Sequence, residues 1–406
     1  METVSDGAFD GVRVVELAQW VFVPVAGALL ADWGADVVHI ERIEGDPYRG
    51  LASQGIGAEA GGVNLNLALA NRGKRSVALD IQTPAGRKVM DQLLESADVF
   101  LTNLRPSALE RLGLDAETLT KRFPRLVYAC GNGYGSRGPE SDRAGYDNSA
   151  YWARGGLAYV LTPPDRDYPI APRGAIGDRN AAMSLAFGIA AALLKRTRTG
   201  SGSVVEVSLL AAAMWTISSD LLAAMGGDSP RAAAGRGVFV NPLVGAYRTQ
   251  DGRHIQLVFL EADRYWSRFC RLLGRDDLIE DPRYATLQAR RENAEACMKM
   301  LDEEFGRRTF AEWKELLGSF DAPWAPVQSV LELLDDPQVL ANGYVGEVEI
   351  DRDTSYRLPA VPVQFDGQSP ELRRAPEHGE QTESVLLELG YGWDDIAALR
   401  DEQVIP

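Results

Sequence analysis

The sequence predicts an α/β protein in which a doubly wound parallel sheet forms a large domain that carries an inserted, smaller α/β domain. Strand patterns alternate with helix patterns over the first 130 residues, which is typical of parallel sheets with helical crossovers. From about residue 226 the character changes to two strands around Asp251-Gly252 and charged helices. Further strands and a final helix follow residue 329. We therefore expect residues 1–225 and 329–406 to form the large domain and residues 226–328 the small one.

The alternation in the first part can be read element by element. Short apolar runs predict strands at Val12–Ala18, Val37–Glu41, Ser76–Ile81, Asp98–Leu104 and Leu126–Cys130. Helical periodicity between them predicts helices at Pro24–Trp33, Thr83–Ala97, Pro106–Gly113 and Asp115–Phe123. This spacing is Rossmann-like. The first turn reads QWVFVP, however, without the glycines that let a dinucleotide pyrophosphate approach the backbone, so NAD binding is disfavoured.

Polar and basic side chains gather around the predicted strand ends. Ligands of doubly wound sheets bind beyond the carboxyl ends of the strands. The chain carries a net charge of −16, so basic residues collected at one edge indicate an anion site that would suit phosphates or a nucleotide. The residues that we assign to this edge are Arg42, Asn71, Arg72, Lys74, Asn103, Leu104, Arg105, Arg111, Asn132, Gly133, Tyr134 and Gly135.

Asp178 stands between a loop containing proline and glycine and the long apolar run Ala181–Leu194. Aspartate before such a run is typical of a helix N-cap, where the carboxylate accepts backbone N–H groups and meets the positive end of the helix dipole. Asp147, which follows Gly145-Tyr146, is a second candidate carboxylate. Taken alone, the pattern around Asp178 favours a structural cap over a catalytic role.

Composition and motifs exclude several classes of function. The acidic total disfavours nucleic acid and anionic membranes as partners, and the apolar runs are too short or too interrupted to span a bilayer. Three scattered cysteines and an N-terminus without a signal-peptide pattern fit a reduced, cytoplasmic protein. No metal-ligand spacing, P-loop or serine-hydrolase motif is present in the sequence, so we expect no metal.

Several ordered segments resemble the family III coenzyme A transferases, the CaiB/BaiF group. This group includes formyl-CoA:oxalate and carnitine CoA-transferases and is related to α-methylacyl-CoA racemase. The matching segments run along nearly the whole chain, among them LLADWGADVVHIER, NRGKRSVALDI, ADVFLTNLRPSALERLGL, PRLVYACGNGYGSRGP and GDRNAAMSLAFGIAAALLKRTRTGSG. The resemblance implies an interlocked homodimer, Asp178 as the catalytic aspartate, and coenzyme A contacts from the strand-end residues named above.

The implied chemistry moves coenzyme A from an acyl-CoA to a free carboxylic acid. A carboxylate attacks the thioester to give a mixed anhydride, and the CoA thiolate returns to give an enzyme thioester that the acceptor acid resolves. At the ordinary aspartate pKa of about 3.9 the attacking group is ionised at neutral pH, so no activating base is expected. Backbone N–H donors at the helix N-terminus are expected to stabilise the oxyanions.

The substrate pocket is predicted to include Val21, Phe22, Tyr146 and Asp147. Val21 and Phe22 make the first turn more apolar than the turn that is typical of the family, which indicates a medium, branched or ring-bearing acyl group. Two alternatives stay open. A racemase needs a histidine where this chain has Tyr146, and tyrosine is a poor base there. A non-catalytic CoA-binding protein would not need Asp178.

Overall fold

The computed structural model describes residues 7–51, 57–227, 241–350 and 354–406. The chain divides into two compact units, which are described separately. Unit 1 contains Met1–Leu161, Tyr168–Pro230 and Pro337–Pro406, and unit 2 contains Thr162–Asp167 and Arg231–Asp336. The predicted start of the small domain, residue 226, adjoins residues 228–240, which lie outside the described residues.

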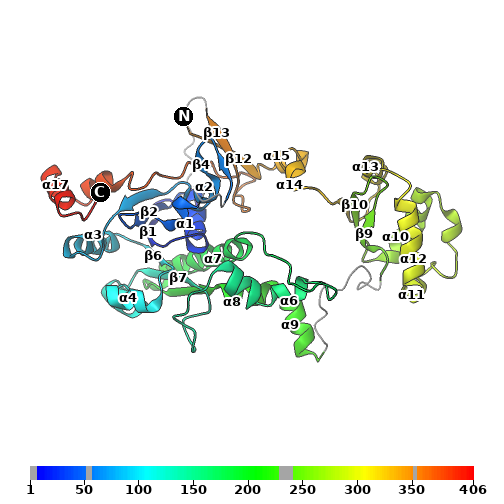
Figure 1. The fold of residues 1–406 in the computed structure, drawn as a ribbon, viewed down its shortest axis with the longest axis horizontal. Coiled ribbons are helices and arrows are strands. Elements are labelled where there is room, and N and C mark those ends of the chain that lie inside the picture. The colour runs from blue at the N-terminus through cyan, green and yellow to red at the C-terminus, as the bar shows by residue number, and fades with distance from the viewer. Residues whose placement is uncertain (1–6, 52–56, 228–240, 351–353) are drawn as a thin grey trace. The chain divides into compact units, whose positions relative to one another are not determined.

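A six-stranded parallel sheet forms the centre of unit 1 (Figure 1). Its strands, in spatial order, are β5 (Arg75–Ala78), β2 (Asp36–Glu41), β1 (Arg13–Leu17), β6 (Val99–Thr102), β7 (Val127–Asn132) and β8 (Val204–Ser208). Every neighbouring pair is parallel. The strand order reverses between β1 and β6, which is the arrangement of a doubly wound sheet with a ligand crevice at that point. The predicted α/β fold with a parallel central sheet is thus confirmed.

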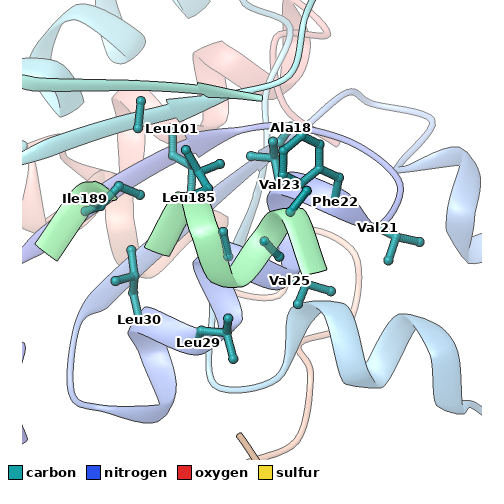
Figure 2. Close-up of a cluster of buried hydrophobic side chains, with 14 of the residues drawn as sticks. Ala18, Val21, Phe22, Val23, Val25, Leu29, Leu30, Leu101, Leu185 and Ile189 are labelled. Carbon is teal, nitrogen blue, oxygen red and sulfur yellow. The ribbon is translucent and has the colours of Figure 1, made fainter. Parts of the chain in front are cut away.

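Helices cover both faces of this sheet because successive side chains of its strands point to opposite faces, and both faces are apolar. On one face Val14 and Leu101 pack with α1 (Phe22–Asp32), α2 (Leu65–Asn71), α7 (Ile176–Thr199) and α8 (Leu209–Thr216). Figure 2 shows Leu185 and Ile189 of α7 beside Leu101 and the apolar side of α1. On the other face Val15 and Phe100 pack with α3 (Pro84–Glu95), α4 (Pro106–Leu112), α5 (Ala116–Arg122), α16 (Thr382–Glu388) and α17 (Trp393–Asp401).

The C-terminal segment belongs to unit 1 and adds to its second face. The Ser76 carbonyl accepts a hydrogen bond from the Gln381 N–H at 2.9 Å, and Asp80 N–H donates to the Val404 carbonyl at 2.8 Å. The remaining elements of unit 1 are η1 (Pro47–Gly50), β3 (Glu59–Ala60), β4 (Val63–Asn64), η3 (Asp147–Ala153), α6 (Leu157–Leu161), α9 (Ser218–Met225), α15 (Pro337–Ala341), β12 (Val345–Glu349) and β13 (Ser355–Pro359).

Unit 2 has a core of its own around a three-stranded antiparallel sheet. Its strands are β9 (Val244–Arg248), β10 (His254–Val258) and β11 (Trp324–Pro326), with β10 in the middle. Trp266 and Trp313 are fully buried against it. The helices are α10 (Ala262–Leu273), η4 (Asp276–Leu278), α11 (Leu287–Glu292), α12 (Ala294–Phe305), α13 (Phe310–Gly318) and α14 (Val330–Leu333).

Candidate active site

Two neighbouring hollows lie at the carboxyl ends of the central strands in unit 1. The first hollow, of about 290 Å³, is lined by residues that include Gln19, Arg42, Asp80, Ile81 and Leu104. The second hollow, of about 280 Å³, is lined by residues that include Gln19, Trp20, Val21, Phe22, Asn103, Leu104, Arg105, Asn132, Gly133, Tyr146 and Asp178. Because both share Gln19 and Leu104, they adjoin at the point where the strand order reverses, where doubly wound folds bind ligands.

Asn103 fixes the turn between β1 and α1 that separates the two hollows. Its side-chain oxygen accepts the Gln19 N–H at 3.0 Å, and its side-chain nitrogen donates to the Gln19 carbonyl at 2.7 Å. Both ends of the amide are therefore used inside the protein. Asn103 lines the second hollow as predicted, and its side chain holds the neighbouring backbone in place.

The predicted N-cap at Asp178 is wrong, because a different carboxylate caps this helix. α7 begins at Ile176, so Asp178 is its third residue. The N-terminal end of the helix is taken by Asp147, whose Oδ1 accepts the Gly177 N–H at 3.0 Å. Asp147 lies at the start of η3 and is buried. With Asp147 in the capping position, the Asp178 carboxylate is left to line the second hollow.

Gly177 is required by this close approach. A Cβ atom at residue 177 would lie 2.3 Å from Asp147 Oδ1 and 2.2 Å from Cγ of the Tyr151 ring, which no other residue tolerates without a shift. The Tyr151 hydroxyl is in turn 2.8 Å from Thr216 Oγ1. The Asn180 side chain donates to the same tyrosine hydroxyl at 3.1 Å. The backbone that carries Asp178 is thus packed from two sides.

The acidity of Asp178 differs from the sequence-based expectation. Burial, and next the negative charge of Asp147, raise the pKa of Asp178 to about 7, against a smaller opposing effect of Arg179. Burial also raises the pKa of Asp147, although hydrogen bonds from the backbone of Gly177 and its neighbours oppose this. The expectation of an ordinary, fully ionised aspartate therefore does not hold for Asp178, and the pKa of the neighbouring Asp147 carboxyl is raised as well.

The turn at residues 71–74 is placed differently from the prediction. Arg72 pairs with Asp32 at 2.6 Å, and both side chains are almost completely buried. Lys74 is also fully buried, where its Nζ donates to Glu16 Oε1 at 2.7 Å, to the Pro24 carbonyl and to Asn71 Oδ1. Asn71, Arg72 and Lys74 line neither hollow. Placing them at the exposed strand edge was wrong, because the acids Asp32 and Glu16 draw both cations into the interior.

Three other predicted cations are exposed and available. Arg42 lines the first hollow, Arg105 the second, and Arg111 a further open hollow beside α4. Within the part of the chain that the structure describes, no hydrogen bond or ion pair engages these three guanidinium groups. Leu104, predicted with them, joins the two main hollows. This row of unpaired cations on an acidic protein is the anion-attracting feature that the sequence predicted.

The residues at the end of β7 and in the loop that follows line two different hollows. Asn132 and Gly133 line the second hollow, and Asn132 Oδ1 accepts the Gly135 N–H at 2.6 Å. Tyr134 and Gly135 line a separate open hollow beside α8. The Tyr134 ring also receives the guanidinium of Arg143, which lies 5.6 Å from its centroid.

Of the four predicted substrate-pocket residues, three lie at the second hollow and one does not. Val21, Phe22 and Tyr146 line the hollow, whereas Asp147 is turned to the α7 backbone. Trp20, which the sequence analysis did not single out, lines it as well. Trp20 carries a positive φ of 70°, and a bulky residue with that backbone angle is an outlier. Nothing in the letters QWVFVP signals this conformation.

In the described ranges, no group of three or more His, Cys, Asp or Glu side chains is placed to hold a metal ion. No helix within these residues has the length and apolar character needed to cross a membrane.

The fold and the site together define an α/β protein with a half-buried, weakly acidic aspartate beside a cationic strand edge. The sequence matches the model of CoA-transferase family III over residues 9–382. The chain is 32% identical to (R)-2-hydroxy-4-methylpentanoate CoA-transferase of Clostridioides difficile, over 98% of this chain and 99% of that protein. It is 34% identical to cinnamoyl-CoA:phenyllactate CoA-transferase of Clostridium sporogenes, over 98% and 97% of the two chains.

A solved structure agrees with the sequence relatives. A CaiB/BaiF family protein from Brucella suis superimposes with a TM-score of 0.81 at 29% identity, over 95% of this chain and all of that one. The chain belongs to CoA-transferase family III and is a CoA-transferase. The predicted family and activity are therefore confirmed, and the racemase alternative is not favoured.

Proposed function

We propose that Asp178 is the nucleophile that carries coenzyme A between two carboxylic acids. The observation that supports this role is the placement of the two carboxylates at the start of α7. Asp147 accepts the Gly177 N–H of the helix, and Asp178 lines the hollow. A carboxylate that merely capped the helix would have its oxygens on the backbone N–H groups. Asp178 is instead available to a ligand in the hollow.

The exchange can be written with every bond accounted for. An oxygen of Asp178 attacks the thioester carbonyl and expels the CoA thiolate, which leaves a mixed anhydride of Asp178 and the donor acid. The thiolate then attacks the Asp178 acyl carbon, releases the donor carboxylate and forms an enzyme thioester. The acceptor carboxylate repeats both steps in reverse, which restores the Asp178 carboxylate and releases the new acyl-CoA.

The raised pKa suits this nucleophile. An ionised carboxylate with a pKa of about 7 is more basic than an ordinary aspartate and therefore a stronger nucleophile once its proton has left. Burial, the largest cause of the raised pKa, also limits the water that could hydrolyse the anhydride or thioester. The Gly177 N–H of α7 is bonded to Asp147, so it is not available as one of the oxyanion donors that were expected at this helix end.

Coenzyme A is proposed to lie along the row of exposed cations. The thioester end would occupy the second hollow beside Asp178, and the phosphates would lie against Arg42, Arg105 and Arg111. Asn132–Gly135 would contribute at the thioester end. Arg72, Lys74 and Asn71 would act only by supporting α1, since the Pro24 carbonyl of that helix accepts a hydrogen bond from Lys74.

A homodimer in the cytoplasm is the proposed working state. Several large apolar side chains of α7 and α8 are exposed in the single chain, with Phe187 at 76% and Trp215 at 80% exposure. Exposed apolar side chains on adjacent elements are typical of an interface between subunits. The three cysteines are all unpaired, which fits a reducing compartment. Light scattering of the purified chain tests the dimer.

An exchange assay tests the transferase mechanism. The chain is incubated with an acyl-CoA and a different free acid, and new thioesters are followed by mass spectrometry. The relatives are named for (R)-2-hydroxy-4-methylpentanoate, cinnamoyl-CoA and phenyllactate, so these compounds are the first to test. We expect exchange by the natural chain and none by Asp178→Asn. Asp394→Asn, which changes an exposed aspartate on α17, is the matched control and should exchange normally.

A further inference from the structure

The second hollow, which Asp178 lines, also has aromatic side chains in its wall. Trp20, Phe22 and Tyr146 all line it, and we call these three side chains the aromatic wall. The Trp20 and Tyr146 rings meet edge to face, with centroids 5.9 Å apart and an interplanar angle of 82°. The polar residues of the hollow, among them Asn103, Arg105 and Asn132, form the rest of the lining.

The backbone at Trp20 is held in its unusual conformation by a buried carboxylate. The Trp20 N–H donates to Asp46 Oδ2 at 3.1 Å, and the same carboxylate caps η1 through the Tyr48 N–H at 2.8 Å. The Tyr48 ring lies against Trp20, with centroids 6.2 Å apart. A positive φ at tryptophan costs free energy, and such strain persists where the surrounding structure enforces it, often at ligand sites.

Phe22 is fixed by a close contact with the end of β7. A Cβ atom at Gly131 would lie 2.7 Å from Cε1 of the Phe22 ring and 2.4 Å from Cγ2 of Val23. The absence of a side chain at Gly131 therefore makes room for the ring. Phe22 is buried, whereas Tyr146 remains 58% exposed at the mouth of the hollow.

We infer that the aromatic wall selects acyl groups with a bulky apolar tail, branched or ring-bearing, over short or strongly polar ones. This inference rests on the proposed function of Asp178. A short polar acid would leave the half-buried Trp20 ring and the exposed Tyr146 ring facing water, whereas an apolar tail would cover that surface. Trp20 is the specificity-determining residue, because a strained backbone and three neighbouring groups hold its ring at the hollow.

The test compares kcat/KM for matched donors that differ only in the tail: cinnamoyl-CoA, 4-methylpentanoyl-CoA and acetyl-CoA, each with the same acceptor acid. We expect the natural chain to favour the two bulky donors by about 10-fold or more over acetyl-CoA, which is the range that apolar pockets achieve. Trp20→Gly removes the ring and also relieves the positive φ, so it should fold. It should lower kcat/KM for the bulky donors by about 10-fold and leave the acetyl-CoA value nearly unchanged.

Three further variants distinguish loss of the aromatic wall from general damage to the enzyme. Tyr146→Phe keeps the ring and should keep the preference, whereas Tyr146→Ala should weaken it by about 2- to 10-fold, the contribution of an edge-to-face pair. Trp393→Ala removes an exposed tryptophan at the start of α17 and should change nothing. A natural chain that prefers acetyl-CoA, or a Trp20→Gly variant that slows all donors equally, overturns the selectivity while leaving the transferase intact. Absence of exchange with every donor overturns both.

Discussion

Asp147 and Asp178 lie at the same end of α7 but in different surroundings. Asp147 lies at the start of η3 and is buried, and one of its oxygens accepts a hydrogen bond from the Gly177 N–H. Asp178 comes from the first turn of α7 itself and lines a hollow at the sheet edge. The comparison shows that the fold places the two carboxylates in different surroundings. Asp147 accepts a hydrogen bond from the helix end, whereas Asp178 lines the hollow, where it is proposed to act as the nucleophile.

Asp147 also influences the acidity of Asp178. The negative charge of Asp147 is the second largest cause of the raised pKa of Asp178, after burial. Asp147 is thus a positioning residue that also sets the acidity of its neighbour. Changes at the two positions should therefore have different effects on exchange and on its pH dependence.

The largest expected effect is the loss of exchange in Asp178→Asn. Removal of a covalent nucleophile should lower kcat by at least about 10³-fold, because an amide cannot form the anhydride. Asp147→Asn keeps the nucleophile and should lower kcat by roughly 10-fold, with about 1 kcal/mol lost from the free energy of unfolding as the cap weakens. Steady-state exchange kinetics and urea unfolding measure the two. Equal loss of activity in both variants would remove the distinction between them.

The second effect is a pH dependence that follows from the raised pKa. The nucleophile must be ionised, so kcat/KM for the acyl-CoA should rise with pH, with its inflection near the Asp178 pKa of about 7. Below the inflection the rate should fall about 10-fold for each pH unit. In Asp147→Asn the repelling charge is gone, so the inflection should move to lower pH. An unmoved inflection would show that Asp147 does not act on Asp178 electrostatically.

The third effect compares the exposed cations with the buried ones. Arg105→Gln or Arg111→Gln should raise KM for the acyl-CoA by about 2- to 10-fold with little change in stability, because each removes one exposed contact to an anion. Lys74→Met removes the lysine that pairs with buried Glu16 and leaves only His39 beside that carboxylate, so it should instead lower the free energy of unfolding by about 3 kcal/mol. Urea unfolding of all three variants, run beside the kinetics, tells the two groups apart. A fully stable Lys74→Met variant with a raised KM would place Lys74 on the ligand.

The smallest expected effect is a higher melting temperature of Asp178→Asn at pH 8. Because folding raises the pKa of Asp178 to about 7, the folded chain keeps a proton that the unfolded chain loses near pH 4. The natural chain therefore loses stability as the pH rises from about 4 to 7, and this loss is complete above the folded pKa. Asp178→Asn has no such loss and should melt a few degrees higher than the natural chain at pH 8, but not at pH 4. A lower melting temperature at pH 8 would contradict the raised pKa.

Much of unit 1 was predictable because strand and helix periodicity are local signals. The predicted strand at Val37–Glu41 and the helix at Pro106–Gly113 each agree with the structure to within one residue. The resemblance in sequence singled out Asp178, and the structure places this residue at the second hollow. Properties that depend on distant partners did not follow. Asp147 is 31 positions before Asp178, so the exchange of the capping role leaves no local pattern. The same holds for Arg72, whose partner Asp32 is 40 residues away.

The first turn shows the remaining gap between pattern and structure. Its apolar letters correctly placed Val21 and Phe22 at the hollow, but they gave no sign of the positive φ at Trp20. That conformation depends on Asp46, a residue in a different loop that holds the Trp20 N–H. The position of a side chain that depends on such a contact cannot be predicted from the periodicity of the sequence.

The most direct test of Asp178 as the nucleophile is to trap its activated carboxyl group, since hydroxylamine attacks the aspartyl carbonyl of the anhydride or thioester and expels the donor carboxylate or the CoA thiolate. The natural chain is mixed with an acyl-CoA and no acceptor, treated with hydroxylamine, digested, and sequenced by mass spectrometry. We predict a hydroxamate on Asp178 in the natural chain and in the control Asp394→Asn, and none in Asp178→Asn. A hydroxamate on another residue, or unmodified Asp178 in a preparation that exchanges CoA, would contradict the assignment.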